Sequence, residues 1–338
     1  MPTSVKAGPS AKSPRRLLRR IGRVLLIGLA VLICLAGTGA VYQARGTAAD
    51  RRNFTPAGRL IDVAGYRMHL HCMGAGSPTV ILESGAGPSS PVWAWVQPAV
   101  AQRTRVCSYD RAGAGWSHPV PGPRDAVRIA GELRALLRLA GESGPFVLAG
   151  HSVGGQYALM FAEHYEQDTA GLVLIDALHP DMLSRLPGGQ KIGQQQQRQI
   201  SLLILLSRLG IVRLFNLASA DARLPAEAQA AIDMTKNSTD SVIAMKAEMQ
   251  AIATNGSQLH AGGDLGSTPL RVLSATDHGA PELEADTLGL QRELAALSTN
   301  SDHEIVTGAD HTSLVTDQHG ARHTIDAIID IVELVRQR

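Results

Sequence analysis

The chain has 338 residues, of which 44% are hydrophobic, 18% charged and 4% aromatic. This composition is that of a globular protein, so a disordered or fibrous chain is excluded. The net charge of +2 is unevenly spread, because residues 1–23 hold seven Lys and Arg and no acidic residue. Residues 53–338 are net negative, and such a body excludes the extended basic surface that a nucleic-acid partner would need.

The basic segment 1–23 leads into residues 24–42, nineteen residues without a charge. At about 1.5 Å per residue this run just spans a bilayer core, and its length favours an uncleaved transmembrane anchor. The positive-inside bias then predicts a cytoplasmic N-terminus and a large domain outside the cell membrane. A cleaved signal peptide, with the small residues 38–40 at the cleavage site and a secreted product, is the alternative. Residues 43–57 are expected to be a linker.

From residue 58 onward, short apolar runs alternate with segments of helical periodicity. The first two runs form a predicted hairpin around Ala64 and Gly65. Buried strands are expected at 79–83, 105–109, 145–149 and 171–175, and an amphipathic helix at 126–139. This alternation predicts an α/β fold with a mostly parallel central sheet and helices on both faces, whose first part is 58–178.

The alternation stops between residues 179 and 266, where only helical signals occur. They are strongest at 200–209, 225–236 and 240–253. Strand patterns resume at 270–274 and 303–306, and the chain closes with a predicted helix at 324–336. We therefore expect an all-helical cap at 179–266, inserted before the second core part at 267–338.

The sequence GHSVG at 150–154 follows a predicted strand and opens a predicted helix. At such a turn, small flanking residues permit a strained backbone that presents a serine hydroxyl at the sheet edge. The turn would also aim the Val153 amide and the helix N-terminus at a developing oxyanion. Ser152 is thus the candidate nucleophile, and a glycine-rich turn with an incidental serine is the alternative.

Three further motifs accompany this turn: ESGAG at 83–87, YDRAGAGWS at 109–117 and a late Asp-His at 310–311. Together they resemble the α/β-hydrolase fold family, specifically its capped serine esterases and lipases, over roughly residues 56–336. The resemblance implies an oxyanion hole formed by the backbone amides of Ala86 and Val153. Many members carry His-Gly where this chain has Ser84 and Gly85, a departure that need not remove a backbone donor.

The resemblance also implies a histidine base, because a free serine hydroxyl is almost wholly protonated at neutral pH. His311 stands after the last predicted strand and before the last predicted helix, where the family places its catalytic histidine. His303, His319 and His323 are nearby competitors. The first is expected in a strand and the other two near a helix start, so structural or surface roles are expected for all three.

The third member should be a carboxylate that orients the imidazole. Asp277 follows the seventh strand, the position that the family uses most often. Asp176 ends the sixth strand, 24 residues after Ser152, a separation that some members also use. The residues before Asp277 lack the usual glycine, so Asp176 is favoured while Asp277 stays open.

Other chemistry-bearing residues are assigned structural roles. Cys34 lies in the apolar run, and Cys72 and Cys107 are expected to be buried free thiols rather than a disulfide. Asp110 and Arg111 are expected to form an ion pair that shapes their loop. No cofactor and no metal site are expected.

These features predict a membrane-anchored serine hydrolase that acts outside the cytoplasm on carboxylic esters or related acyl compounds. Epoxide hydrolases and dehalogenases of this fold use Asp at the elbow, and Ser152 argues against both. The apolar cap favours an apolar small-molecule substrate. Acyl transfer by the same triad and a non-catalytic, membrane-tethered binding protein are the alternatives.

Overall fold

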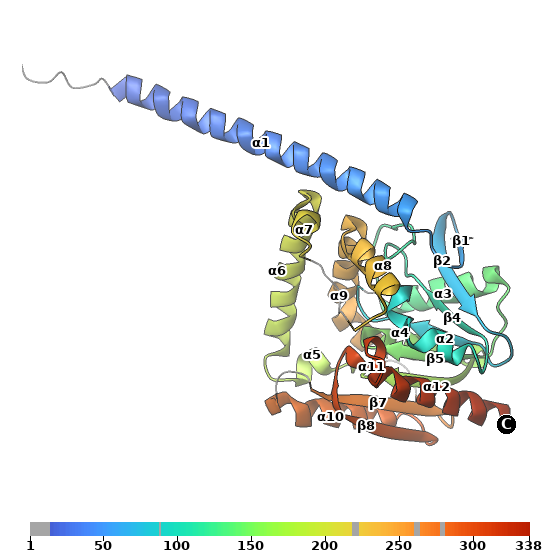
Figure 1. The fold of residues 1–338 in the computed structure, drawn as a ribbon. Helices are drawn as coiled ribbons and strands as arrows, with labels where there is room; N and C mark the ends of the chain where they lie inside the picture. Colours follow the sequence, from blue (N-terminus) through green and yellow to red (C-terminus); the bar gives the residue numbers. More distant parts are fainter. Residues whose placement is uncertain (1–13, 88, 218–222, 260–263, 278–280) are drawn as a thin grey trace, which may run out of the picture.

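The computed structural model describes residues 14–87, 89–217, 223–259, 264–277 and 281–338. Its centre is an eight-stranded sheet with strand order β1-β2-β4-β3-β5-β6-β7-β8 (Figure 1). The strands are β1 (Arg59–Val63), β2 (Tyr66–Met73), β3 (Val80–Glu83), β4 (Val106–Tyr109), β5 (Phe146–His151), β6 (Thr169–Ile175), β7 (Leu270–Asp277) and β8 (Ser301–Asp310). All the expected strands are present.

Parallel pairing dominates the sheet. The β1–β2 and β2–β4 pairs are antiparallel, whereas every pair from β4 through β3 to β8 is parallel. The predicted hairpin joins β1 and β2, with Ala64 at φ 56° and Gly65 at φ 94°. Positive φ at both central residues gives a turn whose twist matches that of the flanking strands. The predicted mostly parallel sheet is therefore confirmed.

Helices cover both faces of the sheet, as the continuous apolar runs of its strands require. Along β5, Phe146 and Leu148 pack in one core cluster with residues of α3 and α4. Val147 and Ala149 point to the other face, into a second cluster with α2 and α12. These helices are α2 (Val96–Val100), α3 (Ala126–Ala140), α4 (Val153–His164), α10 (Pro281–Ala295), α11 (Ser313–Thr316) and α12 (Gly320–Arg336).

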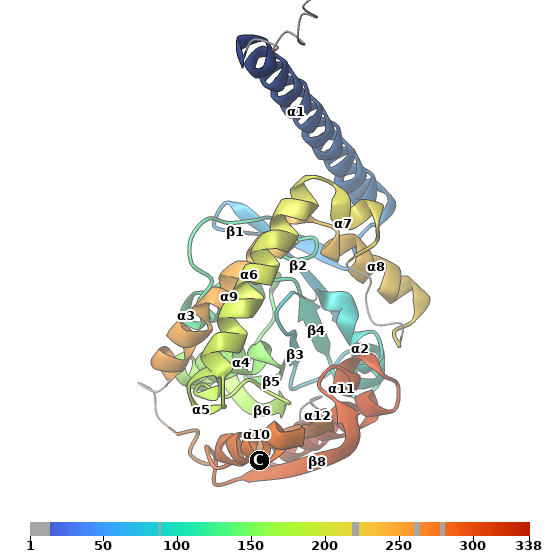
Figure 2. The ribbon, with the colours of Figure 1, turned by 90° about the vertical axis from the view of Figure 1, so that its left-hand side faces the viewer.

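The chain between β6 and β7 holds only helices among its described residues. They are α5 (Met182–Arg185), α6 (Gly189–Arg208), α7 (Ile211–Leu214), α8 (Ala226–Lys236) and α9 (Thr239–Leu259). α6 and α9 lie side by side, and α9 also packs on α3 and α4 (Figure 2). This insertion is the helical cap that the sequence predicts.

The N-terminal helix α1 (Pro14–Asn53) projects away from the sheet and the helices that cover it (Figure 1). Its portion Leu18–Asn53 is long and apolar enough to cross a membrane, with a mean hydropathy of 2.6 in its most apolar stretch. None of that stretch is buried in the structure. The linker expected at 43–57 is helical as far as Asn53, because the last turns of α1 pack on the cap.

The prediction of free thiols at Cys72 and Cys107 is wrong, since the two form a disulfide. They lie directly opposite one another on the antiparallel strands β2 and β4. The sequence separates them by 35 residues, and nothing in the local pattern reveals this register. Cys34 is a free, exposed cysteine on α1.

Candidate active site

Ser152 lies at the sharp turn between β5 and α4. Its backbone adopts φ 58° and ψ −128°. Residues other than glycine rarely adopt this backbone conformation, and it persists only where the surrounding structure enforces it. The Ser152 amide donates to the Ile175 carbonyl at 3.1 Å, and the Ser152 carbonyl accepts from Gly155 and Leu178 at 3.0 and 2.9 Å. The elbow is thus tied to the end of β6.

The glycines of the motif leave room for this turn. A Cβ on Gly150 would lie 2.5 Å from the Gly154 carbonyl oxygen, and one on Gly154 would lie 2.4 Å from that of Glu83. A Cβ on Gly155 would lie 2.4 Å from the Ala177 side chain. Larger residues would push α4 away from β3 and β6, so the glycine spacing follows from close packing around the elbow.

His311 and Asp176 meet at the same edge of the sheet. The Asp176 Oδ2 lies 2.5 Å from the Nδ1 of His311, and its Oδ1 accepts from the Ala275 amide at 3.1 Å. Asp176 directly follows β6 with φ 40° and is buried. The His311 side chain is 41% exposed, so one side of the ring is fixed by the carboxylate while the ring remains accessible.

His151, which the sequence analysis left unassigned, connects the elbow to the histidine loop. Its Nε2 lies 2.8 Å from the His311 carbonyl oxygen, and the two rings are 4.7 Å apart. Burial and the neighbouring His311 lower the pKa of His151 to about 4, so the ring is neutral and donates from Nε2. Its place immediately before the serine was the available sequence signal.

The loop after β3 passes beside the elbow. A Cβ on Gly85 would lie 3.2 Å from the Ser152 Cβ and 3.3 Å from the His151 Nδ1. Ala86 follows and is half-buried, whereas Val153, the first residue of α4, is buried. The two segments expected to supply oxyanion donors therefore flank Ser152.

A buried charge cluster holds that loop against the cap. The Arg111 guanidinium contacts Glu83 at 2.6 Å and Glu248 of α9 at 2.8 Å. It also donates to the carbonyl oxygens of Ser84 at 2.7 Å and Gly85 at 2.6 Å. Burial raises the pKa of Glu83 to about 7 although Arg111 opposes the shift. One side chain thus joins β3, the loop beside Ser152 and the cap.

The expected pair between Asp110 and Arg111 is wrong, because the two side chains have different partners. Asp110 lies 2.9 Å from the Nδ1 of His69, on the neighbouring strand β2. It also accepts from the amides of Ser90 at 2.7 Å and Trp116 at 3.0 Å. Adjacency in sequence suggested a pair that the tertiary structure replaces with two separate networks.

The remaining site candidates have other contacts. His303 lies in β8 and bonds the Ser274 hydroxyl at 2.7 Å, and His323 lies 2.6 Å from Glu304. His319 precedes α12 and packs against His323. Asp277 is the exposed last residue of β7, in register with Asp310 of β8. The carboxylate that the structure brings to His311 is Asp176.

Asp310, next to His311, anchors the histidine loop to the cap. It lies 2.5 Å from Arg223 and accepts from the amides of Thr312 at 2.9 Å and Ser313 at 2.8 Å. Burial opposes the shift, but these hydrogen bonds lower the pKa of Asp310 to about 2. The carboxylate therefore stays ionised and keeps the loop in place.

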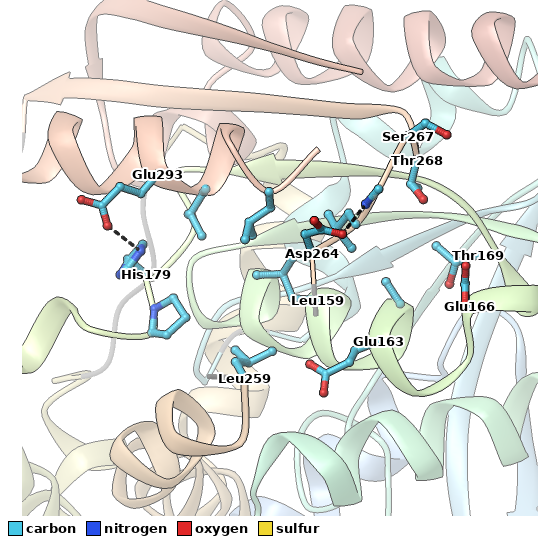
Figure 3. A pocket seen from close by; sticks show the side chains of 16 residues that line it. Leu159, Glu163, Glu166, Thr169, His179, Leu259, Asp264, Ser267, Thr268 and Glu293 are labelled. Carbon is cyan, nitrogen blue, oxygen red and sulfur yellow. Dashed lines mark hydrogen bonds and ion pairs between the residues drawn. The ribbon is translucent and has the colours of Figure 1, made fainter. Parts of the chain in front are cut away.

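A separate cavity of about 650 Å³ lies between α4, α10 and the end of the cap (Figure 3). His179 and Glu293 lie 3.6 Å apart at one side of it, and Glu163, Glu166 and Asp264 add acidic groups. Its lining does not include Ser152. The acidic cavity is thus distinct from the sheet edge that carries the candidate triad.

Comparisons with known proteins agree with this architecture. A 2-hydroxy-6-oxo-2,4-heptadienoate hydrolase of Pseudomonas putida is 34% identical over 129 residues, covering 36% of this chain and 45% of that protein. An uncharacterised protein of Schizosaccharomyces pombe is 31% identical over 139 residues, 33% of this chain and 26% of its own. The matches span no more than half the length of the first curated relatives.

Solved structures resemble the chain over most of its length. The structure of a putative lipase from Acinetobacter baumannii has a TM-score of 0.64 at 17% identity, and the match covers 87% of this chain and 97% of the lipase chain. At such an identity the likeness shows the fold and not the reaction. The sequence model of the Alpha/beta hydrolase family matches residues 80–322. Because this match spans well over half of the sequence, the chain belongs to the α/β-hydrolase family.

Proposed function

We propose that the protein is a membrane-anchored serine hydrolase that cleaves carboxylic esters. The observation that carries the proposal is the 2.5 Å contact between Asp176 and His311, at the sheet edge where the elbow presents Ser152. A histidine fixed by a buried carboxylate and open on its other side is the arrangement that a hydroxyl nucleophile requires. The esterase, lipase and enol-lactonase structures of the same fold are consistent with it.

In the proposed mechanism the Oγ of Ser152 attacks the ester carbonyl and His311 accepts its proton. The Asp176 carboxylate orients the ring and stabilises the imidazolium, while the amides of Ala86 and Val153 donate to the oxyanion. His311 then protonates the leaving alcohol as the tetrahedral intermediate collapses to an acyl-enzyme. Water, deprotonated by His311, releases the acid and restores Ser152.

An ester substrate fits the elbow better than an epoxide. Epoxide hydrolases of this fold, to which the structure is also similar, use an Asp nucleophile, whereas this chain carries Ser152. A serine forms an acyl-enzyme that water can hydrolyse at its carbonyl carbon, as ester cleavage requires. Acyl transfer to an alcohol would use the same residues and is the second candidate.

The cap supports an apolar acyl group. Met245 of α9 lies over the loop beside the elbow, since a Cβ on Gly87 would be 2.6 Å from its sulfur. Methionine is flexible and apolar, so it adapts to aliphatic chains of different shape. We therefore propose aliphatic esters as substrates.

Three features support an extracytoplasmic location. The apolar part of α1 is exposed, seven cations precede it, and Cys72 is bonded to Cys107. Disulfides persist mainly in oxidising compartments, and the cations favour a cytoplasmic N-terminus. We propose a single-pass membrane protein with its catalytic domain outside, and secretion after cleavage of the apolar segment as the alternative.

The test uses the purified full chain, labelled with a fluorophosphonate and assayed on p-nitrophenyl esters from acetate to palmitate. Ser152→Ala should abolish labelling and reduce kcat/KM by at least about 10⁴-fold, whereas Ser201→Ala, on the exposed face of α6, should change neither. Folded wild-type protein that neither labels nor cleaves any ester would refute the proposal and favour the binding-protein alternative.

A further inference from the structure

The cap exposes large apolar side chains on the C-terminal half of α6 and at the end of α7. Each of the following is more than half exposed: Leu202, Leu205, Leu214, Phe215 and Leu217. We call these five residues the apolar corner. Single exposed leucines are ordinary, but α6 and α7 contact one another, and large apolar side chains exposed on neighbouring elements mark an interaction site.

The apolar corner lies beside the membrane helix. A Cβ on Gly39 of α1 would be 2.2 Å from the Leu209 carbonyl oxygen, and one on Gly210 would be 2.8 Å from the Gly39 carbonyl oxygen and 2.9 Å from Tyr42. α7 is next to the C-terminal half of α1 in both views (Figures 1 and 2). The connection between α6 and α7, which lies in sequence between the two parts of the corner, therefore meets α1 at the end of the uncharged run 24–42.

Polar contacts fix the corner at this height along α1. The Gln43 side chain is buried and donates to the Asn237 carbonyl at 2.7 Å. Arg213, within α7, lies 2.7 Å from Asp50 of α1. Within the described residues, the polar contacts from α1 to the cap begin at Gln43, so this level of the helix corresponds to the edge of a bilayer rather than its centre.

We propose that the apolar corner is a second membrane contact, inserted into the outer leaflet of the bilayer that α1 spans. The inference rests on the proposed anchoring. Three observations favour a lipid surface. The connection between α6 and α7 packs on α1 at Gly39 and Tyr42, where α1 also exposes apolar side chains such as Val41. This is the level where α1 leaves the hydrocarbon, and the exposed Arg208 adjoins the corner. Apolar side chains flanked by a cation are typical of helices that lie in the membrane interface.

This contact gives the cap a defined orientation. Because α9 of the same cap contacts both the Arg111 cluster and Gly87 beside the elbow, insertion of the corner would hold the cap and the active site close to the bilayer. An apolar ester could then pass from the leaflet to Ser152 without crossing bulk water.

Fluorescence quenching tests the contact in the full chain. The protein is reconstituted into vesicles of phosphatidylcholine and phosphatidylglycerol without reductant, and one cysteine is labelled with an environment-sensitive fluorophore. The labelled positions are native Cys34, Phe215→Cys with Cys34→Ser, and Ile305→Cys with Cys34→Ser as control. Ile305 is an exposed apolar residue of β8, which lies at the far side of the molecule from α1 in both views.

We expect spin-labelled lipids to quench the labels at 34 and 215 and to spare the label at 305. Quenching at 34 without quenching at 215 would overturn the inference while the anchor stands, and absence of quenching at both would overturn the anchor as well. Energy transfer between labels at 215, without lipid quenching, would show that a second copy of the chain covers the corner instead and would also overturn it.

A second measurement separates insertion from catalysis. Leu214→Glu with Phe215→Glu should lower hydrolysis of a palmitoyl ester held in vesicles by roughly tenfold. This is less than the full transfer energy of two apolar side chains, because α1 still anchors the chain. Hydrolysis of soluble p-nitrophenyl acetate should stay unchanged, as should both activities of Ile305→Glu. An equal loss of hydrolysis of both substrates in the double variant would contradict the inference. Absence of ester hydrolysis in the wild type would instead refute the proposed function.

Discussion

Two Asp–His pairs lie at the sheet, and they differ chiefly in access. His69 lies 2.9 Å from Asp110, with side chains 1% and 0% exposed. His311 lies 2.5 Å from Asp176, with side chains 41% and 3% exposed. The first pair is therefore fully buried, and we call it the sealed pair. The ring of the second pair is accessible to solvent, and we call it the open pair.

Both ring nitrogens of His69 in the sealed pair have hydrogen-bond partners. The second ring nitrogen of His69 lies 2.5 Å from the Ala57 carbonyl oxygen, so both nitrogens face acceptors. Burial lowers the pKa of His69, but the charge of Asp110 and the hydrogen bonds to Asp110 and Ala57 outweigh it and raise the pKa. The comparison teaches that an Asp–His contact does not by itself mark a catalytic pair, since the ring must also reach a reacting group.

The largest effect should come from the open pair. Asp176→Asn would leave the ring of His311 without its anionic partner and favour the wrong tautomer, so kcat should fall by about 10⁴-fold. Asp277→Asn should change kcat by less than a few-fold. Steady-state kinetics on p-nitrophenyl butyrate decide between the acids, and a more damaging Asp277→Asn would reverse our assignment.

The sealed pair should control stability instead. Asp110→Asn removes one partner of a fully buried pair, which costs about 3–5 kcal/mol in free energy of unfolding. Protein that remains folded should still react with a fluorophosphonate, because His69 and Asp110 do not reach Ser152. Urea unfolding of the full chain in detergent measures the first effect, and a folded variant that fails to label would contradict the distinction.

A third cluster is equally buried but adjoins the sheet edge that carries Ser152, so a change there should also lower kcat. Glu248→Gln weakens the hold of α9 on Arg111, which fixes the carbonyls of Ser84 and Gly85. Losing an oxyanion donor costs about 10²–10³-fold in kcat. Because Glu248→Gln would only displace the loop, we expect roughly tenfold with little change in KM. Glu333→Gln, which removes an exposed pair with Arg103, is the matched control and should have no effect.

The sequence predicted those features that depend on local periodicity or on one strand-to-helix turn. The strands, the helix at 126–139 and the cap helices each carry a repeat of apolar residues that their burial requires, and Ser152 stands in a motif whose glycines the close packing around α4 demands. α10 was not expected, because its pattern is weakly amphipathic. The helical end of α1 was assigned to a linker, because the contacts of Gln43 and Asp50 with the cap are tertiary and leave no local pattern.

Pairings across the sheet could not be predicted in this way. The disulfide depends on the register of β2 against β4, and Glu248 reaches Arg111 from a helix 137 residues away. The choice between Asp176 and Asp277 likewise depends on the tertiary position of the His311 loop. Sequence reasoning identified both acids, and geometry favours the one whose strand lies next to the elbow.

The smallest predicted effect concerns pH and again separates the two pairs. Because the folded pKa of His69 is raised above its usual 6.5, its contribution to stability is complete below that pH and is lost as pH rises through the folded pKa. The pKa of Asp110 is lowered from its usual 3.8, so its contribution to stability is lost only as pH falls below that value. The contribution of Asp110 is therefore constant from pH 6 to 9. The stability difference between the wild type and His69→Gln should thus shrink as pH rises across this range, by about 1.4 kcal/mol per unit of pKa shift at most. Glu83 and the other titrating groups are present in both proteins, so their contributions to stability cancel in this difference. Urea unfolding at each pH provides the values, and a difference that stays constant or grows would show that His69 is not held as a cation.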